Sequence, residues 1–325
     1  MDIKNKKFIY PVVSFLIFGY ANLFSQENSV YLNYYLNLFT INPAATGADY
    51  YPSADLSVRR QWLGIPDAPS TLMLAANFRT GRYDFYDPKK FLNKGPLKLT
   101  DRIGLGAAIF RDKNGPLSLT GGLLSYAYHV PIKYDSQLAF GLSTIFNYFT
   151  FNSSILKPDQ ENDPYLFNGN DNVFRVNFNI GIYFYNDVYF IGCSADKILP
   201  DIKMVNDKIR EQPSLFLMGG YKFFRNNNDF NLEPSVVIKR IANNDLSADI
   251  HAKLYIKRYH WIAISYSTDR KINFRFGLML YKRLYAGYNY EFTLSDITSY
   301  SYGSHEIHIG INLGLVGIKG IRDTR

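Results

Sequence analysis

The chain has 325 residues, of which 47% are hydrophobic and 17% aromatic, with 27 Tyr, 25 Phe and only 2 Trp. A mean hydropathy of -0.16 argues against a bundle of membrane helices, whose spans would make this value clearly positive. The net charge of +8 comes from Lys and Arg that are scattered along the chain without a basic run, so no nucleic-acid partner is expected. Spread positive charge can instead meet anionic lipid headgroups or an acidic partner.

The N-terminal 26 residues have the pattern of a secretory signal. Lysines at the start precede an apolar core from Val12 to Leu23, and the small Ser25 offers a cleavage point. No other stretch approaches the roughly 20 apolar residues that a membrane-spanning helix needs. We therefore predict a signal peptide over residues 1–25 and a protein that leaves the cytoplasm.

Residues 26–52 are predicted to form an N-terminal arm, either periplasmic or plug-like. Glu27–Thr40 suits a short amphipathic helix or an irregular segment. Asn42–Gly47 has turn chemistry, because Asn before Pro starts a bend and Gly47 permits a positive φ. The arm then leads into the first strand.

Alternation of apolar and polar residues dominates the chain from residue 53. In Phe174–Phe184, every second side chain is apolar, and residues such as Arg175, Asn177 and Asn179 lie between them. Successive side chains of a strand point to opposite faces, so this segment has one apolar and one polar face. The same pattern predicts about fourteen strands, at residues 53–62, 69–79, 102–111, 118–132, 136–151, 173–185, 188–196, 213–224, 230–240, 246–257, 259–268, 272–282, 284–293 and 304–314.

The connections between these strands alternate in length. The even-numbered connections are mostly tight, as at Asn186-Asp187, whereas Asn152–Asn172 and Lys197–Gln212 are long odd-numbered connections. Thr80–Asp101 breaks the rule, because it is long on the short-turn side. Short turns at one end and long loops at the other are typical of an outer-membrane barrel, whereas a soluble β-sandwich predicts a polar outward face and no such parity.

We therefore predict an all-β fold, a transmembrane antiparallel β-barrel of about 14 strands over residues 53–325, located in the cell outer membrane. A barrel of this size lies between small barrels that are filled by side chains and porins that hold a water channel. A lumen is expected, and either the arm or Thr80–Asp101 is able to plug it.

The same alternation turns ionisable residues of both signs toward the lumen. These residues are Arg175, Glu233, Lys239, Asp249, His251, Lys253, Arg275, Glu291, Glu306 and His308. Two interpretations stay open: a solvated wall whose charges pair with one another, or a binding surface for a partner's chain.

No pattern of catalytic, cofactor-binding or metal-binding residues stands out. His305-Glu306-Ile307-His308 is one residue short of the helical HExxH motif, and on a strand the two histidines point to opposite faces. Gly104-Leu105-Gly106 lacks the third Gly and the βαβ setting of a dinucleotide loop. We predict that the protein is not an enzyme and uses no cofactor and no metal.

A combination of short motifs runs from the arm into the second strand. Asn42-Pro43-Ala44 with Gly47 is followed by Arg59–Gly64 and then by Pro69-Ser70-Thr71. Weaker pieces follow, namely Gly104-Leu105-Gly106, Asp112 with Gly115-Pro116, and Ser304-His305-Glu306-Ile307. Together these residues resemble the PorP/SprF family of outer-membrane proteins associated with the type IX secretion system of Bacteroidota, and the resemblance covers nearly the whole mature chain.

The resemblance implies a barrel that supports type IX secretion and the surface retention of a cargo protein such as a gliding adhesin. It implies as partners the C-terminal sorting domain of the cargo, periplasmic type IX or peptidoglycan-binding components, and outer-membrane lipid. It also implies a motif set of possible partner contacts, namely Asn42, Pro43, Ala44, Gly47, Arg59, Gln61, Trp62, Gly64 and Pro69. The alternative function is an outer-membrane diffusion channel or small-solute transporter, which should pass ions in steps.

Alternation along the first strand assigns sides to its last residues. It places Arg59 and Gln61 toward the lumen, and it places Arg60 and Trp62 toward lipid. An indole at this position fits the aromatic girdle, and Arg60 should reach the rim and its anionic headgroups. Arg59 then either holds an inserted segment with its planar fork or pairs with a carboxylate of the wall.

Overall fold

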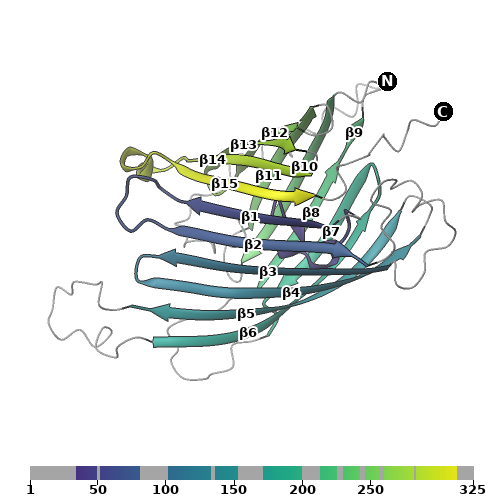
Figure 1. The fold of residues 1–325 in the computed structure, drawn as a ribbon, viewed down its shortest axis with the longest axis horizontal. Coiled ribbons are helices and arrows are strands. Elements are labelled where there is room, and N and C mark those ends of the chain that lie inside the picture. Colours follow the sequence, from purple (N-terminus) through teal and green to yellow (C-terminus); the bar gives the residue numbers. More distant parts are fainter. Residues whose placement is uncertain are drawn as a thin grey trace.

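The structure is a computed structural model that describes residues 34–49, 52–80, 102–132, 136–152, 171–199, 213–224, 230–241, 246–256, 260–281 and 283–312. These residues form one antiparallel sheet that curls into a barrel (Figure 1). The strands are β1 Ser53–Arg60, β2 Ser70–Arg79, β3 Ile103–Asn114, β4 Leu117–Pro131, β5 Gln137–Phe151, β6 Asp171–Tyr185, β7 Tyr189–Asp196, β8 Ser214–Tyr221, β9 Phe223–Phe224, β10 Phe230–Ile241, β11 Leu246–Ile256, β12 His260–Ser267, β13 Lys271–Tyr281, β14 Leu284–Thr293 and β15 Ser304–Asn312.

The sheet closes on itself without a free edge. β1 pairs with β15 through eight consecutive residue pairs, from Ser53 opposite Asn312 to Arg60 opposite His305. β10 pairs with β8 on one side and with β11 on the other. β9 continues β8 beyond Lys222 and also pairs with β10, so the ring has fourteen strands. Closure of this kind satisfies the backbone polar groups that an open sheet edge would expose to lipid.

The alternation that predicted the strands is confirmed by the burial of their side chains. On β6, Phe174 and Ile180 are 62% and 46% exposed, whereas Asn177 and Asn179 are 5% and 1% exposed. The outward face carries the large apolar residues and the inward face carries the polar ones, which is the arrangement of a membrane barrel. Among the residues that the structure describes, no helix is both long and apolar enough to cross a membrane.

All fourteen predicted strands match the observed bounds to within about three residues, and the first strand ends two residues earlier than predicted. β1 ends at Arg60, and Trp62 adopts a left-handed backbone conformation with φ of 45°. A strand cannot continue through that conformation, so alternation no longer decides which way Trp62 points. The assignment of Trp62 to the lipid side of the first strand therefore has no basis in the fold.

The two ends of the barrel differ in what they carry. β1 begins and β15 ends at one end, which we call the terminal end, while the β1–β2 and β14–β15 connections lie at the loop end (Figure 1). The loop end also carries tight turns, because only Gly115 and Pro116 separate β3 from β4. Most residues of the predicted long loops, 152–172 and 197–212, and of the connection 80–101 lie outside the described part of the chain, as does the predicted signal peptide.

The barrel interior holds two apolar clusters in addition to its polar side chains. One cluster joins Tyr34, Ile41 and Ala44 to residues of β6, β8 and β10, including Tyr183 and Met218. The other cluster joins Phe39 to residues of β2, β3, β4 and β5. Both clusters contain residues that precede β1, so a segment from outside the wall completes the packing of the interior.

Candidate functional site

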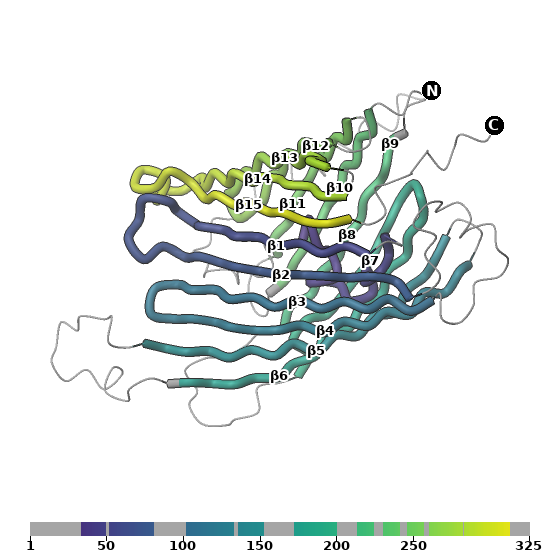
Figure 2. The backbone as a smooth tube through the Cα atoms, in the orientation of Figure 1, coloured from purple at the N-terminus to yellow at the C-terminus, as the bar shows by residue number. Residues whose placement is uncertain are grey.

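The structure describes residues 34–49 of the predicted arm, and they lie inside the barrel. From here on, the arm means these residues. They appear in Figure 2 as the purple segment enclosed by the strands. The arm contains two short 3₁₀ helices, η3 (Leu38–Thr40) and η4 (Pro43–Ala45), and η4 contacts β4, β5 and β6. Residues 37–47 are buried except for the half-buried Leu38. The interior of this barrel is therefore occupied by its own chain.

The sequence of η4 explains its local shape. Asn42 caps the helix, because its Oδ1 accepts a hydrogen bond from Ala44 N at 3.0 Å. Pro43 stands at the first helical position, where its missing N–H is not needed. Thr46 closes the turn by donating from Oγ1 to Pro43 O at 2.7 Å, and Gly47 follows with φ of +73°.

Five glycines of the wall form a seat for the arm. A Cβ at Gly104 would lie 2.0 Å from Thr46 O, and a Cβ at Gly141 would lie 2.1 Å from Ala44 N. The wall side of the seat is completed by Gly106, Gly181 and Gly192, where a Cβ would lie within 2.9 Å of Thr46 or Asn42 atoms. No real Cβ tolerates such distances. The arm backbone approaches the wall at Gly104 and Gly141, and the side chains of Thr46 and Asn42 pack over the other three glycines, only because these positions lack side chains.

Hydrogen bonds hold the arm in this seat. Asn42 Nδ2 donates to Ile182 O at 3.2 Å, and Ser194 Oγ donates to Ile41 O at 2.6 Å. At the end of the arm, Gly47 N donates to Asn77 Oδ1 at 3.2 Å. These contacts reach strands β2, β6 and β7, so the arm is tied to a broad sector of the wall.

A buried polar chain extends from the arm into the wall at the terminal end. His129 Nε2 lies 2.9 Å from Thr46 O, and His129 Nδ1 lies 2.9 Å from Tyr185 Oη. A carbonyl oxygen only accepts, so His129 Nε2 donates to Thr46 O. The single hydroxyl hydrogen of Tyr185 has two acceptors within reach, His129 Nδ1 and Gln137 Oε1 at 3.0 Å. Arg79, which is 1% exposed, donates to Tyr185 Oη at 2.9 Å and to Gln137 Oε1 at 2.8 Å.

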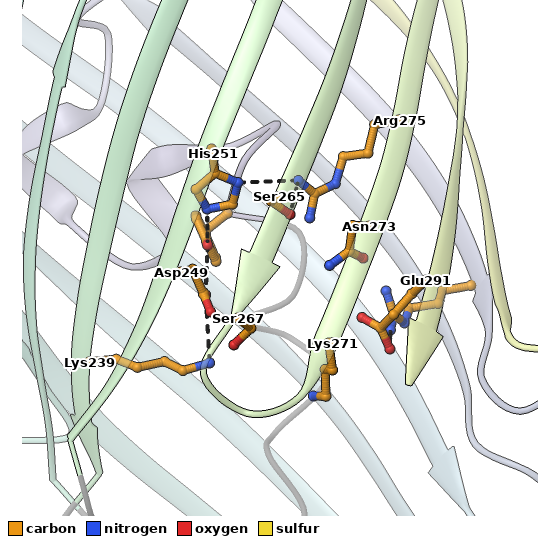
Figure 3. A pocket seen from close by; sticks show the side chains of 11 residues that line it. Lys239, Asp249, His251, Ser265, Ser267, Lys271, Asn273, Arg275 and Glu291 are labelled. Carbon is orange, nitrogen blue, oxygen red and sulfur yellow. Dashed lines mark hydrogen bonds and ion pairs between the residues drawn. The ribbon is translucent and has the colours of Figure 1, made fainter. Parts of the chain in front are cut away.

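The beginning of the arm reaches a second polar cluster in the loop-end half of the barrel, which we call the chamber (Figure 3). Tyr34 Oη donates to Asp249 Oδ2 at 2.8 Å and lies 2.6 Å from His251 Nε2. Arg275 Nη1 lies 3.3 Å from His251 Nδ1 and donates to Ser265 Oγ at 3.1 Å. The cavity left among these side chains has a volume of about 20 Å³, which suits a single water molecule.

Tyr35 brings an aromatic ring to the same cluster. Its ring centroid lies 3.9 Å from Arg275 Cζ, a cation–π distance. Burial, followed by the nearby Glu306 carboxylate, raises the pKa of Tyr35 well above its usual value, although Arg275 and Arg59 act in the opposite direction. Tyr35 therefore stays a neutral phenol at every physiological pH.

The chamber pairs its charges across neighbouring strands. Arg59 Nη2 lies 2.8 Å from Glu291 Oε1, and Arg59 Nη1 lies 3.6 Å from Glu306 Oε2. Lys239 Nζ lies 3.0 Å from Asp269 Oδ2 and 3.6 Å from Asp249 Oδ2. These ion pairs stabilise one another inside the wall and give the chamber charges of both signs.

The sequence profile of the family described as "Type IX secretion system membrane protein PorP/SprF" matches residues 23–311. The chain belongs to the PorP/SprF family. It is therefore an outer-membrane β-barrel protein of the type IX secretion system, and the family is one of secretion components rather than a known enzyme family.

Solved structures similar to this PorP/SprF protein are outer-membrane barrels. Omp33 of Acinetobacter baumannii is 6% identical with a TM-score of 0.45, and the match covers 81% of this chain and 98% of Omp33. A triple mutant of the Rhodopseudomonas blastica porin is 9% identical with a TM-score of 0.35, over 81% and 98% of the two chains. The KdgM porin in complex with disordered oligogalacturonate is 9% identical with a TM-score of 0.36, over 80% and 97%. No curated protein matches the sequence.

The motif set of this PorP/SprF chain divides between the two ends of the barrel. Asn42, Pro43, Ala44 and Gly47 lie in the glycine seat. At the loop end, Gln61 N donates to Pro69 O at 2.9 Å, and Trp62 N lies 3.3 Å from Ser304 Oγ. The motif is therefore not a single surface patch.

The motif residues at the loop end tie two connections together. Leu63 N donates to Gly303 O at 2.8 Å, and Tyr302 N donates to Leu63 O at 2.7 Å. Gly64 has φ of +103°, and a Cβ there would lie 3.0 Å from the Tyr302 ring. Gly64 is required by its backbone conformation and by this close approach.

The structure places all ten predicted lumen-facing residues on the inward face, and it brings five of them together with Arg59 of the motif set. Arg59, Lys239, Asp249, His251, Arg275 and Glu291 line the chamber, with Glu306 beside Arg59. Glu233 and Lys253 are directly paired neighbours on β10 and β11. Arg175 lies on β6, which is not among the strands β1 and β10–β14 that line the chamber.

Lys253 and His308 belong to a separate aromatic group inside the barrel. Lys253 Nζ lies 4.5 Å from the centroid of the Trp261 ring. The Trp261 and His308 rings are parallel to within 7°, with centroids 6.1 Å apart. His305 and His308 point to opposite faces as predicted, and the described residues contain no group of three or more potential metal ligands.

Several residues of the arm contacts were not singled out by sequence reasoning. Tyr34, Tyr35, His129, Tyr185 and Arg79 come from distant parts of the chain, and no spacing rule relates them. The cluster of tyrosines in Glu27–Thr40 was the available signal for an inserted segment. Glycines at inward positions of β3, β5, β6 and β7 were the signal for its seat.

Proposed function

We propose that this PorP/SprF barrel supports type IX secretion and retains a cargo protein, such as a gliding adhesin, at the cell surface by engaging the cargo's C-terminal domain. We propose that it does so together with periplasmic type IX or peptidoglycan-binding components. Family membership supports the secretion role. A lumen filled by the arm supports docking on the barrel in preference to free diffusion through it.

The observation that carries this proposal is the fit of the arm to its seat. Five wall positions lack a side chain where the backbone or a side chain of the arm passes, and the arm supplies residues to both apolar clusters of the interior. A diffusion channel has no use for such a match, because its lumen must stay open to water. A docking component gains from it, because a filled interior keeps the outer membrane sealed while cargo is held.

The cargo role is tested by comparing cells with and without this barrel. We expect the cargo to move from the cell surface to the culture medium when the barrel gene is deleted, and affinity purification from native membranes to recover a protein with a C-terminal sorting domain. Unchanged cargo on the surface of the deletion strain, together with no cargo in the purified complex, would contradict the proposal.

The runner-up is a diffusion channel or small-solute transporter, and single-channel recording separates the two functions. The wild-type barrel in a planar bilayer should show no stepwise conductance. Removal of residues 34–49 should produce steps, because the arm occupies the interior. Stepwise conductance of the wild-type protein at a porin-like level would favour the runner-up.

A further inference from the structure

Three cations lie on the outward face of β1 and β3 near the loop end. On β1, the outward residues Leu56 and Val58 are exposed and apolar, and the next outward residue is the exposed Arg60. On β3, the outward residue Ile109 is 61% exposed and is followed by the exposed Arg111 and Lys113. On both strands, the apolar surface therefore gives way to positive charge over one or two residues on the same face.

The strand register brings these cations together. Ser70 on β2 is directly paired with Arg60 on one side and with Lys113 on the other. Two strand spacings separate the Cα atoms of Arg60 and Lys113 by about 10 Å, and two strand residues separate Arg111 from Lys113 by about 7 Å. The long side chains of Arg60, Arg111 and Lys113 are able to meet above the small Ser70.

No acidic side chain shares this outward face in the described part of β15, β1, β2, β3 and β4. Asp112, which lies between two of the cations in sequence, points inward and accepts a hydrogen bond from Thr71 Oγ1 at 2.8 Å. The exposed Asp67 belongs to the β1–β2 connection and not to the strand face. This surface contrasts with the chamber, where cations and carboxylates are paired.

The long connections 152–172 and 197–212 leave the barrel at the loop end, which outer-membrane barrels turn outward. We propose that Arg60, Arg111 and Lys113 form a binding site for the phosphate groups of an outer-leaflet lipid. Acyl chains of that lipid lie along the apolar surface of β1–β3, including Val58, Leu72 and Ile109, which are 48%, 48% and 61% exposed. The phosphates then meet the three cations where the apolar surface ends. Each basic residue near a lipid surface contributes roughly 1 kcal/mol of attraction to anionic lipid, which is about fivefold in affinity.

The test compares lipid A with the same lipid A after enzymatic removal of its phosphates, by native mass spectrometry of the purified full-length barrel. The wild-type protein should bind phosphorylated lipid A and lose most of this binding with the dephosphorylated form. Each of Arg60→Gln, Arg111→Gln and Lys113→Gln should weaken binding about fivefold, and the triple variant should bind no better than wild type binds dephosphorylated lipid A.

The matched control is Arg240→Gln. Arg240 is also an exposed outward cation near the loop end, but its paired neighbours are Leu215 and Leu246, so its loss should leave lipid A binding unchanged. Heat-modifiable gel mobility restricts the comparison to folded protein. Equal binding by the triple variant and wild type would overturn the site, and equal competition by inorganic phosphate alone would overturn the assignment to a lipid.

Discussion

Arg59 was predicted either to hold an inserted partner segment or to pair with a carboxylate of the wall, and its contacts distinguish the two. Its guanidinium contacts Glu291 and Glu306, and all three side chains are at most 5% exposed. Removing one partner of a buried ion pair leaves an uncompensated charge, which typically costs about 3–5 kcal/mol. The geometry therefore favours wall pairing over contact with an inserted partner segment.

We expect Arg59→Ala to lower the free energy of unfolding of the barrel, measured by urea titration in detergent, by several kcal/mol. The triple variant that adds Glu291→Gln and Glu306→Gln should recover most of this loss, because no buried carboxylate is then left without a cation. If Arg59→Ala unfolds like wild type and yet retains less cargo per folded barrel, Arg59 serves a partner instead.

Neighbouring residues of β6 test the inside-out assignment. Ile180 is 46% exposed on the outward face, whereas Asn179 is 1% exposed and accepts a hydrogen bond from Lys197 N at 3.0 Å. A charge on the lipid face at mid-depth costs roughly 2–4 kcal/mol for Arg or Lys and less for Asp. Ile180→Asp should therefore reduce the folded fraction on heat-modifiable gels more than Asn179→Asp, whose carboxylate still accepts the Lys197 bond. Equal folded fractions would contradict the assignment.

The arm can occupy its place in the barrel only because several wall positions are glycines. Gly141→Ala places a Cβ 2.1 Å from Ala44 N, so arm and wall cannot keep their present contact. Gly122→Ala makes the same change on β4 and meets nothing nearer than 3.6 Å. We expect Gly141→Ala to introduce stepwise conductance in planar bilayers and Gly122→Ala to stay silent. Silence of both folded variants would show that the arm does not seal the lumen.

The strands could be predicted from the sequence because their signal is local. In β6, alternation alone assigns Ile180 outward and Asn179 inward, and lipid on one side enforces that pattern over the whole strand. The end of β1 could not be predicted, because the left-handed Trp62 and the next residue Leu63 bond to Ser304 and Gly303 respectively, more than two hundred residues away.

The candidate site was predictable in its residues but not in its assembly. Sequence alternation identified Asp249, His251 and Arg275 as lumen-facing, yet Asp249 and His251 are joined by Tyr34 of the arm, and Arg275 contacts His251. The position of the arm depends on which strands face each other across the barrel. Neither motif spacing nor composition contains that information.

For the whole molecule, the orientation in the membrane decides which partners each end meets. The terminal end carries the start of β1, and outer-membrane barrels keep short turns in the periplasm and long loops outside. The 186–188 turn joins β6 to β7 at the terminal end, and Asn186 Oδ1 accepts from Val188 N at 2.8 Å. Loops 152–172 and 197–212 follow β5 and β7, and both start at the loop end of the barrel.

We expect epitope tags within 152–172 and 197–212 to be labelled by antibody on intact cells, and a tag at Asn186-Asp187 to be labelled only after the outer membrane is permeabilised. Long loops tolerate insertion better than the tight turn, so each tagged protein is first checked for its folded fraction. A tag at the predicted periplasmic turn that is labelled on intact cells would invert the barrel. The three cations on the outward face of β1 and β3 would then meet the inner leaflet, and phosphatidylglycerol instead of lipid A would be the phosphate-bearing lipid within their reach.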